Sequence, residues 1–476
     1  MVVRHFADTL RSSSCSRNLR ALVLQKSKTS PLSRRMAHDL KSACVATFAA
    51  GVEATMQLKF LVVVLFFFGS LGPAQAHAYT EVMSLPLVIE QAQTQNPQVR
   101  ATRYRWESAQ HQILQNYYPA DPTFSYLNSD SPRYPLGGQE GLENFTISQS
   151  FQFPGKGWMQ GTQAKRTAEI ARLTYVAALR DVKALAETGY YQLQLDEALI
   201  DLFTENVANL ERVQKVTQIA YTANQVTQGD FINGQFALEA DRETLRQQRV
   251  TVANDKTTLN VLLNRSPDEP LEVDRNLNLG TFETPLDAII ARAVTSRQEI
   301  LETALTEKNQ NTALTLAKLE YAPDYTITIG YDHWIIASFA PTPNNTKDWN
   351  FQLAWNVPIY FPAKNEDIKR ARNDLNAARE DLGSIRVQTA GNVTSLYRQI
   401  LRSRETALLY RNTLIPLAHQ AFEVMLIAYQ SGKVDFITLI SAFRQESAAR
   451  AGYLQAVNAL LAGKVAIEQA AGGALQ

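Results

Sequence analysis

Residues 144–156 read Asn-Phe-Thr-Ile-Ser-Gln-Ser-Phe-Gln-Phe-Pro-Gly-Lys. Large apolar side chains alternate there with small polar ones, so an extended strand would carry most of its apolar residues on one face and its polar residues on the other. The segment ends at Phe153-Pro-Gly-Lys156, and no proline follows until Pro267. Because proline costs about 3 kcal/mol inside a helix, a proline-free stretch of this length permits a very long helix. A strand that leads directly into a long helix is therefore the expected unit of the fold.

This unit occurs twice in the chain. Two markers recur 208 residues later: Phe153-Pro-Gly-Lys156 as Phe361-Pro-Ala-Lys364, and Tyr221-Thr-Ala-Asn224 as Tyr429-Gln-Ser-Gly432. We place the first repeat at 84–266 and the second at 284–470. Since the two markers keep their separation in both repeats, we expect the helices between them to have the same length.

Apolar residues recur every seven positions along both expected helices. The two series are Leu179, Ala186, Leu193, Ile200 and Val207, and then Val393, Ile400, Ala407, Leu414 and Ala421. Sustained heptads indicate helices packed side by side as in coiled coils. About 60 residues at 1.5 Å each give rods of about 90 Å. An ordinary helical bundle would explain any one heptad, but it does not explain two matched rods of this length.

Alternation between apolar and polar residues predicts four strands, at about 123–128, 144–153, 325–334 and 349–357. We expect long polar connections at 129–143 and 335–348 to join them in pairs. Strands of about 9–11 residues with an aromatic face and an uncharged polar face are typical of transmembrane β-barrels, although a soluble sheet with one solvated face is the alternative. Four strands cannot close a barrel, and an open edge is not tolerated in hydrocarbon, so the sequence predicts an oligomer.

The fold class predicted from these patterns is an α+β membrane protein. Its chain would be a tandem repeat of long coiled-coil-like helices. Its four β-strands would contribute to a transmembrane β-barrel, and three copies would supply twelve strands, within the range known for such barrels.

The first 78 residues differ in composition from the rest, with ten Lys and Arg against three acidic residues. A short charged start at Met56, the apolar run 60–68 and an Ala-x-Ala ending predict a secretory signal peptide at 56–76, cleaved after Ala76 or Ala78. Residues 1–55 are then either an additional leader or an over-extended start, with Met56 as the true initiator.

Removing residues 1–78 changes the character of the chain. Both cysteines, Cys15 and Cys44, are lost, and 37 Lys and Arg remain against 43 Asp and Glu, a net charge of about −6. A mildly acidic chain argues against a nucleic-acid partner. The remaining histidines are His111, His333 and His419, each in a different expected element and without a partner at metal-ligand spacing. No nucleophile-elbow or phosphate-loop pattern stands out, so we expect no enzymatic activity, no metal site and no cofactor.

The signal peptide, the paired repeats of strands and long helices, and the turn near Tyr429 resemble the outer-membrane efflux protein family typified by TolC. The resemblance covers residues 80–470, and 149–156 is similar to the branch of the family that serves heavy-metal pumps of the RND class. It implies a homotrimeric conduit: a twelve-stranded β-barrel in the outer membrane of a Gram-negative bacterium, continued by a periplasmic α-barrel that the long helices form. An inner-membrane pump and a periplasmic adaptor protein would complete the conduit, with metal cations, drugs or secreted proteins as alternative cargoes. A secreted coiled-coil scaffold, or an adaptor that spans no membrane, is the alternative of another class.

The resemblance also implies two candidate sites at the helix-to-helix turns. The adaptor would dock on Tyr221, Ala223, Asn224, Gln225, Tyr429, Ser431, Gly432 and Lys433, where Gly432 and Asn224 suit a left-handed turn. The gate residues would be Asp230, Asn233, Asp435, Thr438 and Ser441. Thr438 and Ser441 stand where the family has two aspartates, which puts a double-aspartate ring in doubt. Three copies of Asp230 would form an acidic ring that favours cations, and Asp230 would also serve as the N-cap of its helix.

Overall fold

The computed structural model describes residues 82–132, 139–223, 226–275, 277–280, 282–337 and 344–475. The chain divides into two units, Met1–Tyr79 and Thr80–Gln476, and every described residue belongs to the second. The expected leader and signal peptide therefore lie outside the described residues.

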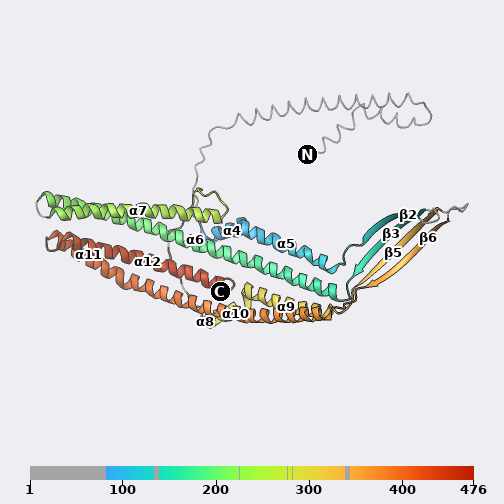
Figure 1. Ribbon diagram of the computed structural model, residues 1–476. Helices are drawn as coiled ribbons and strands as arrows, with labels where there is room; N and C mark the ends of the chain where they lie inside the picture. The colour runs from blue at the N-terminus through green and yellow to red at the C-terminus, as the bar shows by residue number, and fades with distance from the viewer. Residues whose placement is uncertain are drawn as a thin grey trace, which may run out of the picture. The chain divides into compact units, whose positions relative to one another are not determined.

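Two series of elements follow the same order along the chain (Figure 1). The first is α4 (Leu85–Gln95), α5 (Pro97–Tyr117), β2 (Thr123–Pro132), β3 (Gln139–Phe151), α6 (Lys156–Thr222) and α7 (Gln228–Leu262). The second is α8 (Leu286–Ser296), α9 (Gln298–Leu319), β5 (Tyr325–Ala337), β6 (Asn344–Trp355), α10 (Phe361–Leu409), the π-helical turn η1 (Tyr410–Leu414), α11 (Ile415–Gln430) and α12 (Phe436–Ala470). Two short strands, β1 (Val82–Met83) and β4 (Glu272–Val273), pair in parallel. The predicted α+β class with paired long helices is confirmed.

The four long strands form one antiparallel sheet in the order β2-β3-β5-β6. Each strand extends further than expected toward its hairpin loop, whereas β3 and β6 end two residues before the expected 153 and 357. Ladder pairs extend to Pro132 opposite Gln139 in the first hairpin and to Ile336 opposite Asn344 in the second. The long polar connections expected at 129–143 and 335–348 are therefore wrong. The ladder needs only backbone N–H and C=O groups, so it continues where the side chains no longer alternate.

Both long helical stretches bury the central heptad positions that the sequence marks, while Leu179, Ile200 and Val207 of α6 are half-buried. In α6, Ala186 and Leu193 are fully buried, and in α10 Val393, Ile400 and Ala407 are fully buried. The packing is supplied mainly by α5, α7, α9 and α12, which lie along these two helices. Within the described ranges, no helix is long and apolar enough to cross a membrane.

The second heptad series is buried only as far as Ala407, so the prediction that it continues through Leu414 is wrong. Leu414, the next position of the series, is 36% exposed. The π-turn η1 (Tyr410–Leu414) begins three residues after Ala407 and contains Leu414, and it shifts the faces of the helix. Pro416 follows directly, and its missing N–H removes one helical hydrogen bond, a common cause of such irregularities.

Candidate functional site

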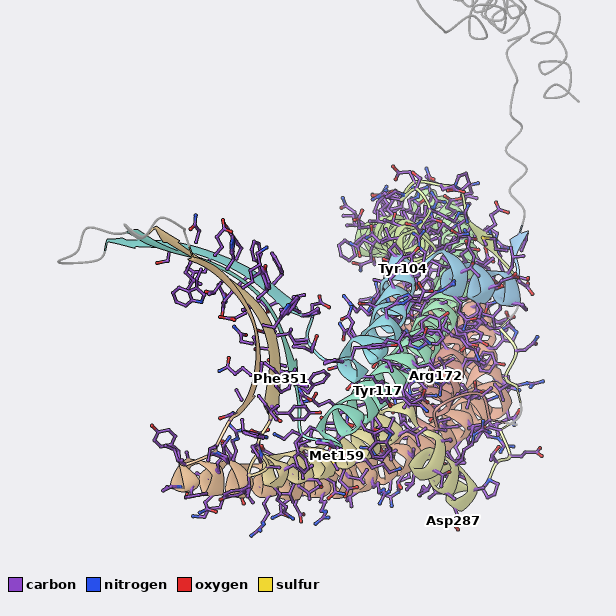
Figure 2. All side chains as sticks on the ribbon, turned by 90° about the vertical axis from the view of Figure 1, so that its right-hand side faces the viewer. Tyr104, Tyr117, Met159, Arg172, Asp287 and Phe351 are labelled. Atoms are coloured by element: carbon purple, nitrogen blue, oxygen red, sulfur yellow. The ribbon has the colours of Figure 1, made fainter. Side chains whose placement is uncertain are left out.

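The sheet carries an apolar face that continues across all four strands. Residues directly opposite each other in the ladder share a face, so the register defines rows across the sheet. One row is Phe124, Ile147, Ile329 and Phe351, and the next is Tyr126, Phe145, Tyr331 and Trp349. Aromatic rings touch within these rows: the ring centroids of Tyr126 and Phe145 are 4.7 Å apart, and those of Tyr331 and Trp349 are 5.2 Å apart. Phe351 is 68% exposed and Trp349 is 77% exposed, so in a single chain this face is bare (Figure 2).

The apolar face has a defined height. It runs along β5 from Tyr325 to Tyr331, a rise of about 20 Å at 3.4 Å per residue. The next row on the same face is polar and contains Glu143, His333 and Lys347. His333 Nδ1 lies 3.2 Å from the Glu143 carboxylate. An apolar band of this height bounded by charged residues matches the lipid-facing belt of a membrane barrel, which is about 25 Å tall.

The opposite face of the sheet is a ladder of hydroxyl and amide groups. Hydroxyl pairs bridge neighbouring strands: Ser125 with Thr146 at 2.6 Å, Ser148 with Thr328 at 2.9 Å, and Ser150 with Thr326 at 3.0 Å. Further along, the Asp332 carboxylate accepts hydrogen bonds from Asn144 and Asn350. Small polar side chains that hydrogen-bond to each other still leave room and polarity for water, which suits the wall of an aqueous lumen.

The junction between sheet and helices is built around Lys156, the first residue of α6. Its side chain is only 4% exposed, and its Nζ lies 2.9 Å from Asp324 Oδ1 and 3.2 Å from the Ala322 carbonyl oxygen. Asp324 Oδ1 also accepts a hydrogen bond of 2.7 Å from the Phe153 backbone N–H. The nearby Tyr117 ring covers the first turns of α6 (Figure 2). The sequence identified Lys156 only as a marker, because its partner lies 168 residues away.

The first helix-to-helix turn joins α6 to α7 at the end of the helices far from the sheet (Figure 1). The N-cap of α7 is Thr227, so the prediction that Asp230 is the N-cap is wrong. The two residues form a capping box instead, in which the Asp230 N–H donates to Thr227 Oγ1 at 3.1 Å and the Thr227 N–H donates to Asp230 Oδ2 at 3.2 Å. The pattern Thr-x-x-Asp at 227–230 was the signal that would have found this arrangement.

The second turn joins α11 to α12. Here the aspartate is at the N-cap and the threonine is three residues later, the reverse of the first turn. Asp435 is the N-cap here, and its Oδ1 accepts from the Thr438 N–H at 2.9 Å and from the Thr438 hydroxyl at 2.5 Å. These hydrogen bonds lower the pKa of Asp435. The missing aspartate at Thr438 is thus matched by an aspartate three residues earlier, at the position that Thr227 holds in the first repeat.

The expected left-handed turn is present in the second repeat. Gly432 has φ +69°, its N–H donates to the Tyr429 carbonyl oxygen at 2.9 Å, and the Lys433 N–H donates to the Ala428 carbonyl oxygen at 2.9 Å. This pattern is a Schellman motif, which favours glycine. In the first repeat Asn224 and Gln225 lie outside the described residues, while Ala223 follows the last residue of α6.

A groove of about 800 Å³ brings the two turns together. Its walls include Val216, Ile219, Thr227, Asp230, Tyr429, Ser431, Gly432 and Asp435. Tyr429 is buried at its base, where its hydroxyl lies 3.1 Å from Thr217 Oγ1 of α6, and burial together with the nearby Asp230 carboxylate raises the pKa of Tyr429. Two carboxylates from different repeats therefore line one groove.

The remaining candidate residues lie on the surface around this groove. Tyr221 is partly exposed and stacks on Phe231, with ring centroids 5.4 Å apart. Asn233, Lys433, Thr438 and Ser441 are exposed, and the Ser441 hydroxyl donates to the Thr438 carbonyl oxygen at 2.8 Å. Exposed side chains at adjacent turns suit contact with another protein.

Comparisons with known proteins agree with this architecture. The family described as outer membrane efflux protein matches residues 289–473. The cobalt-zinc-cadmium resistance protein CzcC of Cupriavidus metallidurans is 19% identical over 292 residues, which cover 61% of this chain and 68% of that protein.

Solved structures share the fold over most of the chain. CusC, described in terms of transmembrane channel formation, has a TM-score of 0.71 at 15% identity and covers 82% of this chain and 92% of its own. The outer membrane protein VceC of Vibrio cholerae has a TM-score of 0.70 at 14% identity and covers 82% of this chain and 96% of its own. Residues 289–473 thus match the outer membrane efflux protein family, and the chain shares the fold of the solved structures of CusC and VceC.

Proposed function

We propose that this chain is the outer-membrane channel subunit of a tripartite efflux system, a passive conduit that performs no chemistry of its own. The observation that carries the proposal is the four-stranded sheet, whose apolar face is about as tall as a lipid-facing belt and whose other face is a hydroxyl ladder. A scaffold that spans no membrane would have no use for an exposed face of this kind.

The proposed conduit is a homotrimer. Strands β2 and β6 are the two edges of the described sheet, and unpaired backbone groups at such edges are costly in lipid. Pairing β6 of each copy with β2 of the next would give a closed barrel of about twelve strands from three copies. The long helices α6 and α10 would then continue the channel through the periplasm.

Cell fractionation tests this assignment. We expect the chain in the outer-membrane fraction, soluble only in detergent and trimeric by light scattering or cross-linking. A monomeric chain found in periplasmic extract would instead support the scaffold or adaptor alternative and would overturn the proposed function.

An inner-membrane pump and a periplasmic adaptor protein are the proposed partners. The adaptor would dock on the helix-to-helix turns, where Tyr221, Ala223, Asn224, Gln225, Tyr429, Ser431, Gly432 and Lys433 are the candidates. The gate candidates remain Asp230, Asn233, Asp435, Thr438 and Ser441, and support for them comes from the groove in which Asp230 and Asp435 lie together.

Heavy-metal cations are the proposed cargo, because the relative CzcC is a cobalt-zinc-cadmium resistance protein. Deleting the gene should sensitise the parent bacterium to cobalt, zinc or cadmium salts, and the intact gene should restore resistance. Sensitivity to drugs alone, or loss of a secreted protein, would point to drug efflux or type I secretion through the same channel design.

A further inference from the structure

We propose that neighbouring subunits are joined by Lys364 of one copy and Asp121 of the next, with Trp355 of β6 opposite Phe124 of the adjacent β2. The inference rests on the proposed homotrimer and specifies the joint between its subunits. The chain already contains one such joint, between its two repeats. We infer that the same contacts form between the open edge strand β6 of one copy and the open edge strand β2 of the next.

The joint inside the chain is made by the start of one repeat's long helix and the start of the other repeat's hairpin. Lys156 at the start of α6 is nearly fully buried and contacts Asp324, which precedes β5 directly. The adjacent strands β3 and β5 pair at Phe151 and Tyr325. One buried cation, the Asp324 carboxylate at 2.9 Å, the Glu320 carboxylate at 3.5 Å and one strand pair thus join the first repeat to the second.

The sequence holds a second copy of both charged residues. Lys364 lies 208 residues after Lys156, in the repeated Phe-Pro-x-Lys marker. Asp121 lies 203 residues before Asp324, and both occur in the pattern Tyr-x-x-Asp-x-Thr, at 118–123 and 321–326. Asp121 precedes β2 and Lys364 follows β6, and these two strands are the open edges of the described sheet.

Within one chain, Lys364 and Asp121 do not make the buried ion pair that Lys156 and Asp324 make. The Lys364 side chain is 27% exposed, against 4% for Lys156, and its Nζ contacts only Glu320, at 3.2 Å, among the described carboxylates. Asp121 is exposed and forms no ion pair with any described residue. A cation and a carboxylate at opposite open edges are complementary in charge, and a second copy of this chain is the partner that would present both.

Other ion pairs between the repeats have no such second copy. The Arg180 guanidinium of α6 lies 2.6 Å from the Glu299 carboxylate of α9. A spacing of 208 residues places Gln388 at the position of Arg180. The spacing of 201 residues between the starts of α5 and α9 places Gln98 at the position of Glu299, which leaves no charges to pair. The lysine and the aspartate of the junction therefore occur in both repeats, whereas the residues of the nearby Arg180–Glu299 ion pair occur only once.

The strand register between subunits follows from the two hairpins. Phe124 is opposite Ile147 in the first hairpin, and Ile327 is opposite Leu353 in the second. Aligning the two hairpins makes Phe124 equivalent to Ile327 and Ile147 equivalent to Leu353, an offset of 206 residues between β3 and β6. When the pairing of β3 with β5 is transferred with these offsets to β6 and the next β2, Trp355 faces Phe124, Leu353 faces Tyr126 and Ala354 faces Ser125. The transferred register keeps apolar residues on the apolar face and places Ala354 and Ser125 on the polar face, which a shift by one residue would reverse.

Cysteine cross-linking tests the register. In a chain with Cys15 and Cys44 replaced by serine, the pair S125C and A354C should give covalent trimers on a non-reducing gel that return to single chains on reduction. The pair S148C and T328C is the matched control, because it joins positions opposite each other within one chain and should leave the subunit size unchanged. A third pair, S125C and N350C, lies four residues out of register and should not cross-link.

A double-mutant cycle tests the ion pair. D121N and K364M should each lower the temperature at which the trimer dissociates, and the double variant should lose no more than the larger single effect. Additive losses would overturn the ion pair.

The failure of the joint can be told from the failure of the proposed function. A stable outer-membrane trimer that does not cross-link at Ser125 and Ala354, or that prefers Ser125 and Asn350, overturns the joint and leaves the channel in place. If the unmodified chain is not a trimer in the outer membrane, both proposals fall. Circular dichroism of each variant separates loss of folding from loss of assembly.

Discussion

At the scale of single residues, two carboxylates lie side by side between α6 and α7. Asp196 of α6 is buried and accepts hydrogen bonds of 2.6 Å from both Gln192 and Gln248. Asp255 of α7 faces it, and its buried Oδ2 has no partner among the described residues. Burial and the adjacent Asp196 raise the pKa of Asp255 to about 6, so the pair holds one proton until near neutrality.

Because the folded state raises the pKa of Asp255, we expect the contribution of the Asp196–Asp255 pair to the free energy of unfolding to fall as the pH rises. An unfolded aspartate has a pKa of about 3.9, so between that value and about 6 the folded chain binds more protons than the unfolded chain, and stability decreases across this window. We expect D255N to raise the melting temperature by a few degrees at about pH 8, because the amide removes the second charge, and to change it little at about pH 4. Thermal melts in detergent measure this. D374N, at an exposed aspartate of α10, is the control, and an equal rise for D255N at both pH values would contradict the prediction.

Lys156 is the second residue whose substitution should be costly. Its buried ammonium group makes two hydrogen bonds, one of them to a carboxylate, and the hydrogen bonds of charged groups contribute about 1.5–3 kcal/mol each. We expect K156M to lower the free energy of unfolding by about 3 kcal/mol, read from denaturant midpoints, because Asp324 loses its cation. K165M, at an exposed lysine of the same helix, should change it by less than about 0.5 kcal/mol. Equal effects of the two substitutions would refute the role of Lys156.

At the scale of elements, the π-turn η1 packs against α12. Tyr410 begins this turn, and its ring lies where a Cβ on Gly452 would stand, at 2.6 Å. G452A must displace the ring, so we expect a loss of about 1–3 kcal/mol in unfolding free energy. G383A in α10 has open space around the new methyl group and should instead stabilise the helix by up to about 1 kcal/mol. Thermal or denaturant unfolding of the two variants checks the opposite signs.

The elements that the sequence predicted correctly are those set by local periodicity. Alternation along 144–153 and heptads along α6 report directly which face is buried, so both elements could be predicted. The heptad pattern did not show the π-turn, because the apolar series continues through it to Leu414, and the contact of Tyr410 with Gly452 of α12 is not contained in the local sequence. The same holds for the site: Gly432 was predictable from its turn, whereas the burial of Lys156 depends on Asp324 of the other repeat.

At the scale of the whole molecule, the two turns present one carboxylate per repeat. Asp230 and Asp435 line the same groove, so a trimer would carry six carboxylates at this end of the channel. Both also cap helices, which means that a substitution by alanine would confuse lost charge with lost structure. Asparagine separates the two roles, since it keeps an oxygen that accepts the capping hydrogen bonds and removes the charge.

The last prediction concerns ion passage through the assembled channel. We expect D230N and D435N together to lower the cation selectivity of single channels in a planar bilayer and to weaken block by divalent cations, because a ring of carboxylates concentrates cations at an entrance. T227A and T438A disturb the same caps without changing the charge and should leave selectivity unchanged while lowering thermal stability by about 1 kcal/mol for each cap. If the asparagine variants conduct as the unmodified channel does, these carboxylates act only as helix caps and the entrance is controlled elsewhere.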